Sequence, residues 1–161
     1  MTILYEDNHI IAINKTCNEI VQGDKTGDVP VSELVKAYIK DKYDKPGEVF
    51  LGVTHRLDRP TTGVVLFART SKALVRLNEM FKSHEEIQKT YWAIVQTPPP
   101  SPEGRLEHYL VRNEKQNKSY VVLPKKDGSY PKEAKRAVLT YKTIGKSDRY
   151  TLLSIGLQTG R

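Results

Sequence analysis

The stretch that decides the fold comprises residues 49–68, which read VFLGVTHRLDRPTTGVVLFA. Its two ends, 49–53 and 64–68, are apolar and rich in β-branched residues, so they predict two buried strands. The polar loop between them carries one carboxylate, Asp58, close in sequence to two guanidiniums, Arg56 and Arg59. Functional side chains often lie on loops that a rigid scaffold holds in place. No other segment of the sequence has the features of an active site.

The loop itself predicts a reactive carboxylate. The positive charge of Arg56 and Arg59 favours the ionised form of Asp58, which a carboxylate nucleophile requires. Pro60 restricts the backbone, and residues 61–63, Thr-Thr-Gly, supply hydroxyl groups and a turn before the next strand. A second interpretation stays open at this point: Asp58 accepts hydrogen bonds within a turn, and the arginines pair with it only to hold the loop.

The complete string from His55 to Gly63 resembles the first catalytic motif of the RluA-type family of RNA pseudouridine synthases, and it matches every fixed position of that motif. The resemblance extends along the chain in the order of the family, although residues 98–148 match only loosely. Members of the family continue beyond Thr-Gly-Arg into further strands, so the resemblance implies that the C-terminal part of the fold is missing here. The other matching segments are LYEDNH at 4–9, NK at 14–15, SKAL at 71–74, KTY at 89–91 and TGR at 159–161.

The resemblance implies an isomerase that converts uridine to pseudouridine in ribosomal or transfer RNA, with no cofactor and no metal. The reaction breaks the bond from C1′ of the ribose to N1 of uracil, rotates the base, joins C1′ to C5 and removes the C5 proton. By resemblance Asp58 is the essential catalytic aspartate. Three routes stay open for it: addition to the sugar, addition to the base, or electrostatic assistance to the departing uracil.

The resemblance also suggests roles for Arg56 and Tyr91. Arg56 matches the arginine that helps hold RNA with its target nucleotide flipped out of the stack, although pairing with Asp58 is equally compatible with its position. Tyr91 matches the tyrosine that stacks on uracil and is implicated in C5 deprotonation, with core packing as the alternative. In a strand over 89–96, Tyr91 and its neighbour Trp92 would point to opposite faces.

Four more residues are expected to bind substrate. His55, Arg59 and Thr62 belong to the same motif, although a loop histidine such as His55 is more often a hydrogen-bonding turn residue. Arg161 matches the arginine of Thr-Gly-Arg. The catalytic prediction thus comprises Asp58 and Tyr91, and the substrate-binding prediction comprises Arg56, His55, Arg59, Thr62 and Arg161.

The remaining sequence predicts an α+β fold: a mixed, largely antiparallel sheet flanked by two helices, forming one catalytic domain over 1–161. No N-terminal RNA-binding domain is expected, because the family pattern begins at residue 3. Ser32 and Ser71 are predicted to cap the two helices, 32–43 and 71–84. The proline-rich segment 97–102 is interpreted as a surface loop. Strands are expected at 3–5, 10–13, 19–21, 49–53, 64–68, 89–96, 106–111, 120–123, 137–141 and 150–155.

Charge favours a polyanionic partner. The net charge is +7 and the isoelectric point is about 9.4. Residues 105–136 contain nine lysines and arginines against four acidic residues, a net +5. This segment is either an ordinary solvated surface or, beside an RNA-modifying motif, a surface that follows phosphates. RNA is the expected partner, with no DNA and no membrane.

The single cysteine, Cys17, is interpreted as a small core residue of a cytoplasmic protein, because one thiol forms neither an intramolecular disulfide nor a cysteine-based metal site. No signal peptide or membrane-spanning stretch is visible in the sequence. Two other functions stay open. The chain could be an RNA-binding module with little or no catalysis, or a hydrolase that uses Asp58 on a glycosidic bond and releases free uracil. The target uridine and the oligomeric state are not readable from the sequence.

Overall fold

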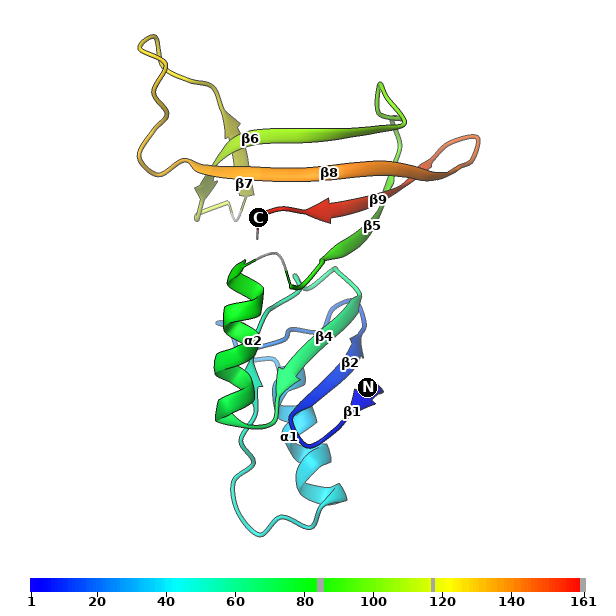
Figure 1. Ribbon diagram of the computed structural model, residues 1–161, viewed down its shortest axis with the longest axis vertical. Helices are drawn as coiled ribbons and strands as arrows, with labels where there is room; N and C mark the ends of the chain where they lie inside the picture. Colours follow the sequence, from blue (N-terminus) through cyan, green and yellow to red (C-terminus); the bar gives the residue numbers. More distant parts are fainter. Residues whose placement is uncertain (84–85, 117, 160–161) are drawn as a thin grey trace. The chain divides into compact units, whose positions relative to one another are not determined.

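Two antiparallel sheets organise the chain, one in each of two units, residues 1–86 and 87–161 (Figure 1). The computed structural model describes residues 1–83, 86–116 and 118–159. The α+β class is confirmed, but the single mixed sheet is replaced by two sheets in which every described strand pair is antiparallel. Strands joined by short turns pair with their chain neighbours, which keeps each sheet within one segment. The prediction of one domain over 1–161 stays a prediction.

In residues 1–86 the sheet has the strand order β1-β2-β4-β3 and a helix on each face. Its side chains alternate along the strands, so Ile11 and Ile13 share one face while Ile10 lies on the other. The helix α1 packs on the first face and α2 on the second, and the two predicted helices are confirmed. The bounds are β1 (Thr2–Glu6), β2 (Ile10–Lys15), α1 (Val31–Lys42), β3 (Gly52–Val53), β4 (Gly63–Ala68) and α2 (Ser71–Ser83).

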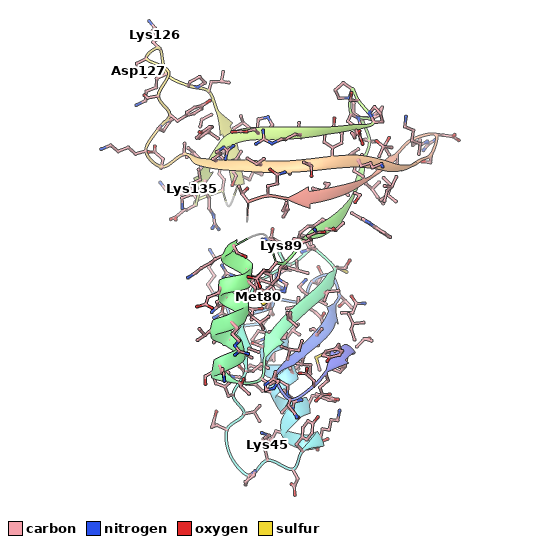
Figure 2. The ribbon with its side chains drawn as sticks, in the orientation of Figure 1. Lys45, Met80, Lys89, Lys126, Asp127 and Lys135 are labelled. Atoms are coloured by element: carbon pink, nitrogen blue, oxygen red, sulfur yellow. The ribbon has the colours of Figure 1, made fainter. Side chains whose placement is uncertain are left out.

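Two hydrophobic clusters form these interfaces. Ile11, Ile13, Val65 and Phe67 of the sheet are fully buried against α1, which contributes Val31, Val35 and Ile39. Against α2, Ala68 packs with Ala73 and Leu77, and Leu66, Leu74 and Met80 complete the layer (Figure 2). The apolar stripes of both helices therefore face the sheet, as amphipathic helices do.

The predicted N-cap of α1 is wrong. Ser32 is buried inside the first turn, and the capping position is occupied by Pro30, whose side chain accepts no hydrogen bond. The first helical N–H groups instead donate to main-chain oxygens: Val31 to Ile20 at 2.8 Å and Ser32 to Val21 at 3.2 Å. Residues 19–21, which were expected to be a strand, thus cap the helix with their backbone.

The cap of α2 lies one residue earlier than expected. Thr70 Oγ1, not the Ser71 hydroxyl, accepts the hydrogen bond from the Ala73 N–H group at 3.1 Å. The prediction that Cys17 lies in the core is also wrong, because Cys17 is exposed after the end of β2. Lys15, two residues earlier, takes the last inward position of that strand instead.

Residues 87–161 form a five-stranded sheet in the order β5-β9-β8-β6-β7. The strands predicted at 89–96, 106–111, 120–123, 137–141 and 150–155 are confirmed, and most are longer than the apolar runs that predicted them. The proline-rich residues 97–102 connect two of these strands within the unit. The bounds are β5 (Thr90–Val95), β6 (Glu103–Asn113), β7 (Lys118–Val122), β8 (Lys135–Lys146) and β9 (Thr151–Leu157). In the described part of the chain, neither helix has the length and apolar character needed to cross a membrane.

Candidate active site

At the start of the loop that carries Asp58, side-chain hydrogen bonds take the place of the backbone hydrogen bonds of a strand. After β3 ends at Val53, the Thr54 hydroxyl donates to the Leu66 carbonyl at 2.5 Å, and His55 Nε2 accepts the Leu66 N–H at 3.1 Å. Both backbone groups of Leu66 are therefore satisfied where the β3 ladder has stopped. The His55 ring also packs against Phe81 of α2, with ring centroids 4.7 Å apart. The structure thus supports the interpretation of His55 as a hydrogen-bonding residue of the loop.

The middle of the loop is held by a buried ammonium group. Lys15 is fully buried at the end of β2, and its Nζ lies 2.7 Å from the carbonyl oxygen of Thr61, 3.1 Å from that of Arg59 and 3.2 Å from that of Asp58. Its fourth acceptor is the Thr16 carbonyl, at 3.0 Å. Burial lowers the pKa of the Lys15 ammonium below its ordinary value. Three loop carbonyls thus converge on one charge, which fixes the path of the backbone at Asp58 and directly after it.

Sequence reasoning missed this role of Lys15. The signal that could have revealed it is the period of β2: Ile11, Ile13 and Lys15 alternate onto the inward face, so a lysine stands where the pattern demands a buried residue. A lysine is almost never fully buried unless partners satisfy its hydrogens. The partners come from 43 to 46 residues further along the chain, so no local pattern indicates them.

The loop directs its charged side chains outward. Leu57 packs against the core beside α1, whereas Arg56 and Asp58 on either side of it are exposed. A main-chain bond from the Thr61 N–H to the Asp58 carbonyl, 2.9 Å long, closes the turn that follows. Gly63 has a φ of 134°, which glycine adopts readily and other residues do not. The Asp58 carboxylate is therefore presented to solvent from a rigid backbone.

Arg59 does not pair with Asp58, contrary to the expectation that both arginines surround that carboxylate. Its guanidinium lies 2.8 Å from Asp28 and 3.8 Å from Asp24, and it donates to Thr26 Oγ1 at 3.1 Å. The same side chain donates to the Asn18 carbonyl at 3.2 Å. These contacts fasten the segment 18–28 to the Asp58 loop. Within the described residues, no ion pair joins Asp58 to Arg56 or Arg59.

Among the other predicted site residues, Thr62 is exposed at the end of the same loop. Tyr91 belongs to residues 87–161, where it lies half-buried on β5 opposite Ile155 of β9. Its neighbour Trp92 is 74% exposed, so the prediction that the two rings point to opposite faces is confirmed. Arg161 lies outside the described residues. The structure thus brings five predicted residues together on one loop, namely His55, Arg56, Asp58, Arg59 and Thr62.

The exposed side chains of the loop suit a polar substrate. No three His, Cys, Asp or Glu side chains of the described chain gather as metal ligands would. What the loop offers is one exposed carboxylate, one exposed guanidinium and a hydroxyl, from Asp58, Arg56 and Thr62. A carboxylate can act as a nucleophile or stabilise a cationic sugar, and a guanidinium can bind phosphate.

Comparisons with known proteins show the family of the chain. Residues 9–161 match the family model of RNA pseudouridylate synthase. The chain is 32% identical, over 160 residues, to ribosomal large subunit pseudouridine synthase C of Buchnera aphidicola, covering 99% of this chain and 46% of the relative. It is 30% identical over 172 residues to tRNA pseudouridine synthase C of Vibrio cholerae, covering all of this chain and 65% of that protein. The chain belongs to the RNA pseudouridylate synthase family.

A solved structure has the same fold. Human RNA Pseudouridylate Synthase Domain Containing 4 superposes with a TM-score of 0.80 at 23% sequence identity, over 99% of this chain and 60% of the human chain. The chain thus spans about half to two thirds of the length of these relatives.

Proposed function

We propose that this protein isomerises uridine to pseudouridine in structured RNA, with the Asp58 carboxylate as the reacting group. The family to which the chain belongs supports the reaction. Among the structural observations, the one that carries the proposal is the fixed backbone of the Asp58 loop: the Lys15 ammonium binds the carbonyls of Asp58, Arg59 and Thr61, while the Asp58 side chain stays exposed.

A rigid backbone matters because the reaction needs a carboxylate in one place through several steps. Cleavage of the bond from C1′ to N1 develops positive charge on the ribose and negative charge on uracil. A carboxylate positioned near C1′ stabilises the sugar, or bonds to it or to the base, until C5 replaces N1. Positioning of this kind lowers the barrier because the group does not have to be ordered at the moment of reaction. The three routes differ in whether Asp58 bonds to the sugar, bonds to the base, or forms no bond and acts by its charge alone.

Arg56 and Tyr91 are proposed to hold the flipped nucleotide. The target uridine has to leave its stack to reach the carboxylate, at a cost of a few kcal/mol. The exposed Arg56 lies two residues before Asp58. Its guanidinium can bind a phosphate or occupy the space in the stack that the flipped base leaves. The Tyr91 ring provides a surface on which uracil stacks, and its phenolate oxygen is the proposed acceptor of the C5 proton, which leaves Tyr91 as the neutral phenol.

The substrate is proposed to be ribosomal or transfer RNA. The names of the Buchnera and Vibrio relatives point to the large-subunit ribosomal RNA and to transfer RNA, respectively. A net charge of +7 suits either polyanion. No cofactor enters the scheme, because the product is an isomer of the substrate.

The test is tritium release from uridine labelled at C5 in unmodified ribosomal RNA and transfer RNA. The 161-residue chain is assayed alone and fused to the C-terminal segment of the longer Buchnera relative, each as wild type and as Asp58→Asn. Asp148→Asn, which changes an exposed aspartate in the turn between β8 and β9, is the matched control. We expect release by the wild type and by Asp148→Asn, and a loss of at least about 1000-fold in Asp58→Asn.

The same experiment separates the alternative functions. An RNA-binding module would retain RNA in every form and release no tritium. A hydrolase would produce free uracil, which chromatography of the reaction mixture detects. Release that persists in Asp58→Asn would contradict the role proposed for the aspartate.

A further inference from the structure

Eight of the nine basic residues of segment 105–136 fall into two groups in the structure. Arg105 and Arg136 both bind Glu107: Arg105 Nη1 lies 2.6 Å from Glu107 Oε2, and Arg136 Nε lies 2.5 Å from Oε1. The hydrogen bond from Arg136 and then that from Arg105 hold the pKa of Glu107 below its ordinary value. These arginines are therefore engaged within the sheet, across β6 and β8, and their charge is partly compensated there.

Six lysines of the same segment are in a different situation. All six are exposed, and among the described residues none forms an ion pair. Of the acidic residues nearby, Asp127 is engaged in its own turn, where Oδ1 accepts the Ser129 N–H at 2.9 Å and the Ser129 hydroxyl at 2.7 Å. The lysines, which we call the lysine end, are Lys115, Lys118, Lys125, Lys126, Lys132 and Lys135.

These lysines share one end of the five-stranded sheet. The register pairs Asn113 with Lys118 and Leu110 with Lys135, so the connection from β6 to β7 and the beginning of β8 lie close together. Figure 2 shows Lys126 at the far end of the loop between β7 and β8, and Lys135 where that loop rejoins the sheet. At about 3.3 Å per residue, the other end of β8, at Lys146, lies about 35 Å away.

The loop that carries three of the lysines has a defined conformation. The Lys125 N–H donates to the Ser129 carbonyl at 2.7 Å, and the Gly128 N–H donates to the Lys125 carbonyl at 2.9 Å. Tyr130 then stacks on Tyr109 of β6, with centroids 3.7 Å apart and planes 13° apart. The loop is thus fastened to the sheet, so ordering it costs little entropy when a partner binds.

The chemistry of this surface fits a phosphate backbone. A lysine ammonium is a compact point charge that attracts phosphate without reading sequence. Phosphates neutralised by lysines release counterions, which makes the contribution to affinity dependent on salt.

We propose that the lysine end is a second RNA-binding surface, which contacts backbone phosphates outside the target nucleotide. The choice of RNA among polyanions rests on the proposed function. The lysine end contributes affinity for the RNA, whereas turnover of bound RNA depends on the Asp58 loop.

The test compares two triple variants that remove the same charge. Lys125→Gln/Lys126→Gln/Lys132→Gln changes the lysine end, and Lys142→Gln/Lys146→Gln/Arg149→Gln changes exposed basic residues towards and beyond the opposite end of β8. Binding of an unmodified transfer RNA transcript and of a mixed-sequence RNA hairpin is measured over a series of salt concentrations. We expect the first variant to bind both RNAs about 10-fold more weakly at low salt, with a slope of log K against log salt that is smaller by about 2.

Two controls keep the outcomes distinguishable. Circular dichroism establishes that both variants fold, since all six positions are exposed. Tritium release at saturating RNA should be equal in the wild type and both variants. If RNA binding depends on the lysine end but no form releases tritium, the proposed catalysis fails and this inference stands. Equal losses of affinity in both variants, or no loss in either, would overturn it.

Discussion

At the scale of single residues, Lys15 explains how a short loop becomes rigid. An ammonium group has three hydrogens, and four carbonyl oxygens lie within 3.2 Å of Lys15 Nζ. Its desolvation is offset only because these acceptors replace water. The loop carbonyls in turn need the ammonium, since buried acceptors without a donor are costly. Lysine and loop therefore stabilise each other.

We predict that Lys15→Met lowers the free energy of unfolding by about 3 kcal/mol, because the loop carbonyls lose a shared charged donor in a buried place. The methionine has a similar length and no hydrogens to donate. Urea denaturation followed by circular dichroism measures the change. Lys36→Met is the control: it removes a partly exposed lysine paired with Glu33 one helical turn away, and should change stability by less than about 0.5 kcal/mol. A Lys15→Met protein as stable as the control would contradict the structural role.

For Arg59 the structure predicts an effect on turnover rather than on RNA binding. A lysine at position 59 keeps the charge but not the planar fork that reaches Asp28, Asp24 and Thr26 together. We expect Arg59→Lys to reduce turnover at saturating RNA by about 10-fold, because a small displacement of the Asp58 loop is costly to the reaction. The affinity for RNA should stay within about twofold of the wild type.

Single-turnover tritium release and an RNA-binding titration separate these two quantities. Arg76→Lys, on the exposed surface of α2, is the control and should change neither. The opposite pattern, weaker binding with unchanged turnover, would show that Arg59 contacts RNA, as the substrate-binding prediction expects.

How far the sequence anticipates the site depends on where the partners of each residue lie. The loop and the outward position of Asp58 follow from two apolar runs around a polar stretch. The ion pairs of Arg59 were not predictable from the sequence. Arg59 is next to Asp58 in the chain, but its side chain points away from that carboxylate. Its carboxylate partners, Asp24 and Asp28, lie more than 30 residues earlier. The role of Lys15 was not predictable for the same reason, because its carbonyl partners in the loop lie 43 to 46 residues further along the chain. Local charge patterns therefore predict the proposed reactive group, Asp58, but not the contacts that hold its loop in place.

At the scale of elements, most strands were predictable because period-two alternation is a local property, although residues 19–21 form no strand and the strand expected at 49–53 is only Gly52–Val53. The beginnings of the helices were not predictable. Ser32 satisfies the sequence rule for an N-cap, yet the carbonyls of Ile20 and Val21 take that role. A backbone acceptor has no sequence signature. The division into two sheets was likewise hidden, because alternation does not specify which strands pair.

One carboxylate connects three elements in residues 1–86. Glu6, at the end of β1, accepts hydrogen bonds from Tyr38 at 2.9 Å and from Lys42 at 2.7 Å, both on α1. It also binds Tyr43 at 2.8 Å and Arg69, just after β4, at 3.0 Å. Burial alone would raise the pKa of Glu6, but the hydrogen bonds from Lys42, Tyr43 and Tyr38 outweigh it and bring the pKa to about 2.

This shift predicts the pH dependence of stability. Between its pKa of about 2 in the folded protein and its ordinary value of 4.5, Glu6 binds fewer protons folded than unfolded. Its contribution is therefore fully present above about pH 4.5 and is lost as the pH falls towards 2. We expect Glu6→Gln to lower the free energy of unfolding by about 2 kcal/mol at neutral pH.

The difference between wild type and Glu6→Gln should shrink steadily below about pH 4.5, as urea denaturation at a series of pH values would show. Glu33→Gln, which breaks an exposed pair on α1, serves as the reference for a surface carboxylate. A difference that stays constant down to pH 2 would mean that the charge of Glu6 is not what stabilises the cluster.

At the scale of the whole molecule, the two units differ in how well each buries its own apolar surface. Of the sixteen buried hydrophobic side chains of the described residues, thirteen lie in residues 1–86, where helices cover both faces of the sheet. Among the described residues of 87–161, the only buried hydrophobic side chains are those of Val138, Tyr141 and Leu153, while Trp92 and Ile94 are 74% and 72% exposed. Small domains are marginally stable even with a good core, so this imbalance should decide which unit is stable alone.

We therefore predict that residues 1–86, expressed alone, unfold cooperatively on heating and bind no anilinonaphthalene sulfonate, because their hydrophobic core is complete within the fragment. Residues 87–161 alone should bind the dye and lose their structure without a sharp transition, since a sheet with exposed apolar side chains lacks fixed packing. Thermal unfolding followed by circular dichroism, with dye fluorescence measured in parallel, tests both halves of the prediction. A fragment 87–161 that unfolds sharply and binds no dye would show that the five-stranded sheet is stabilised by its strand pairing and its three buried side chains alone.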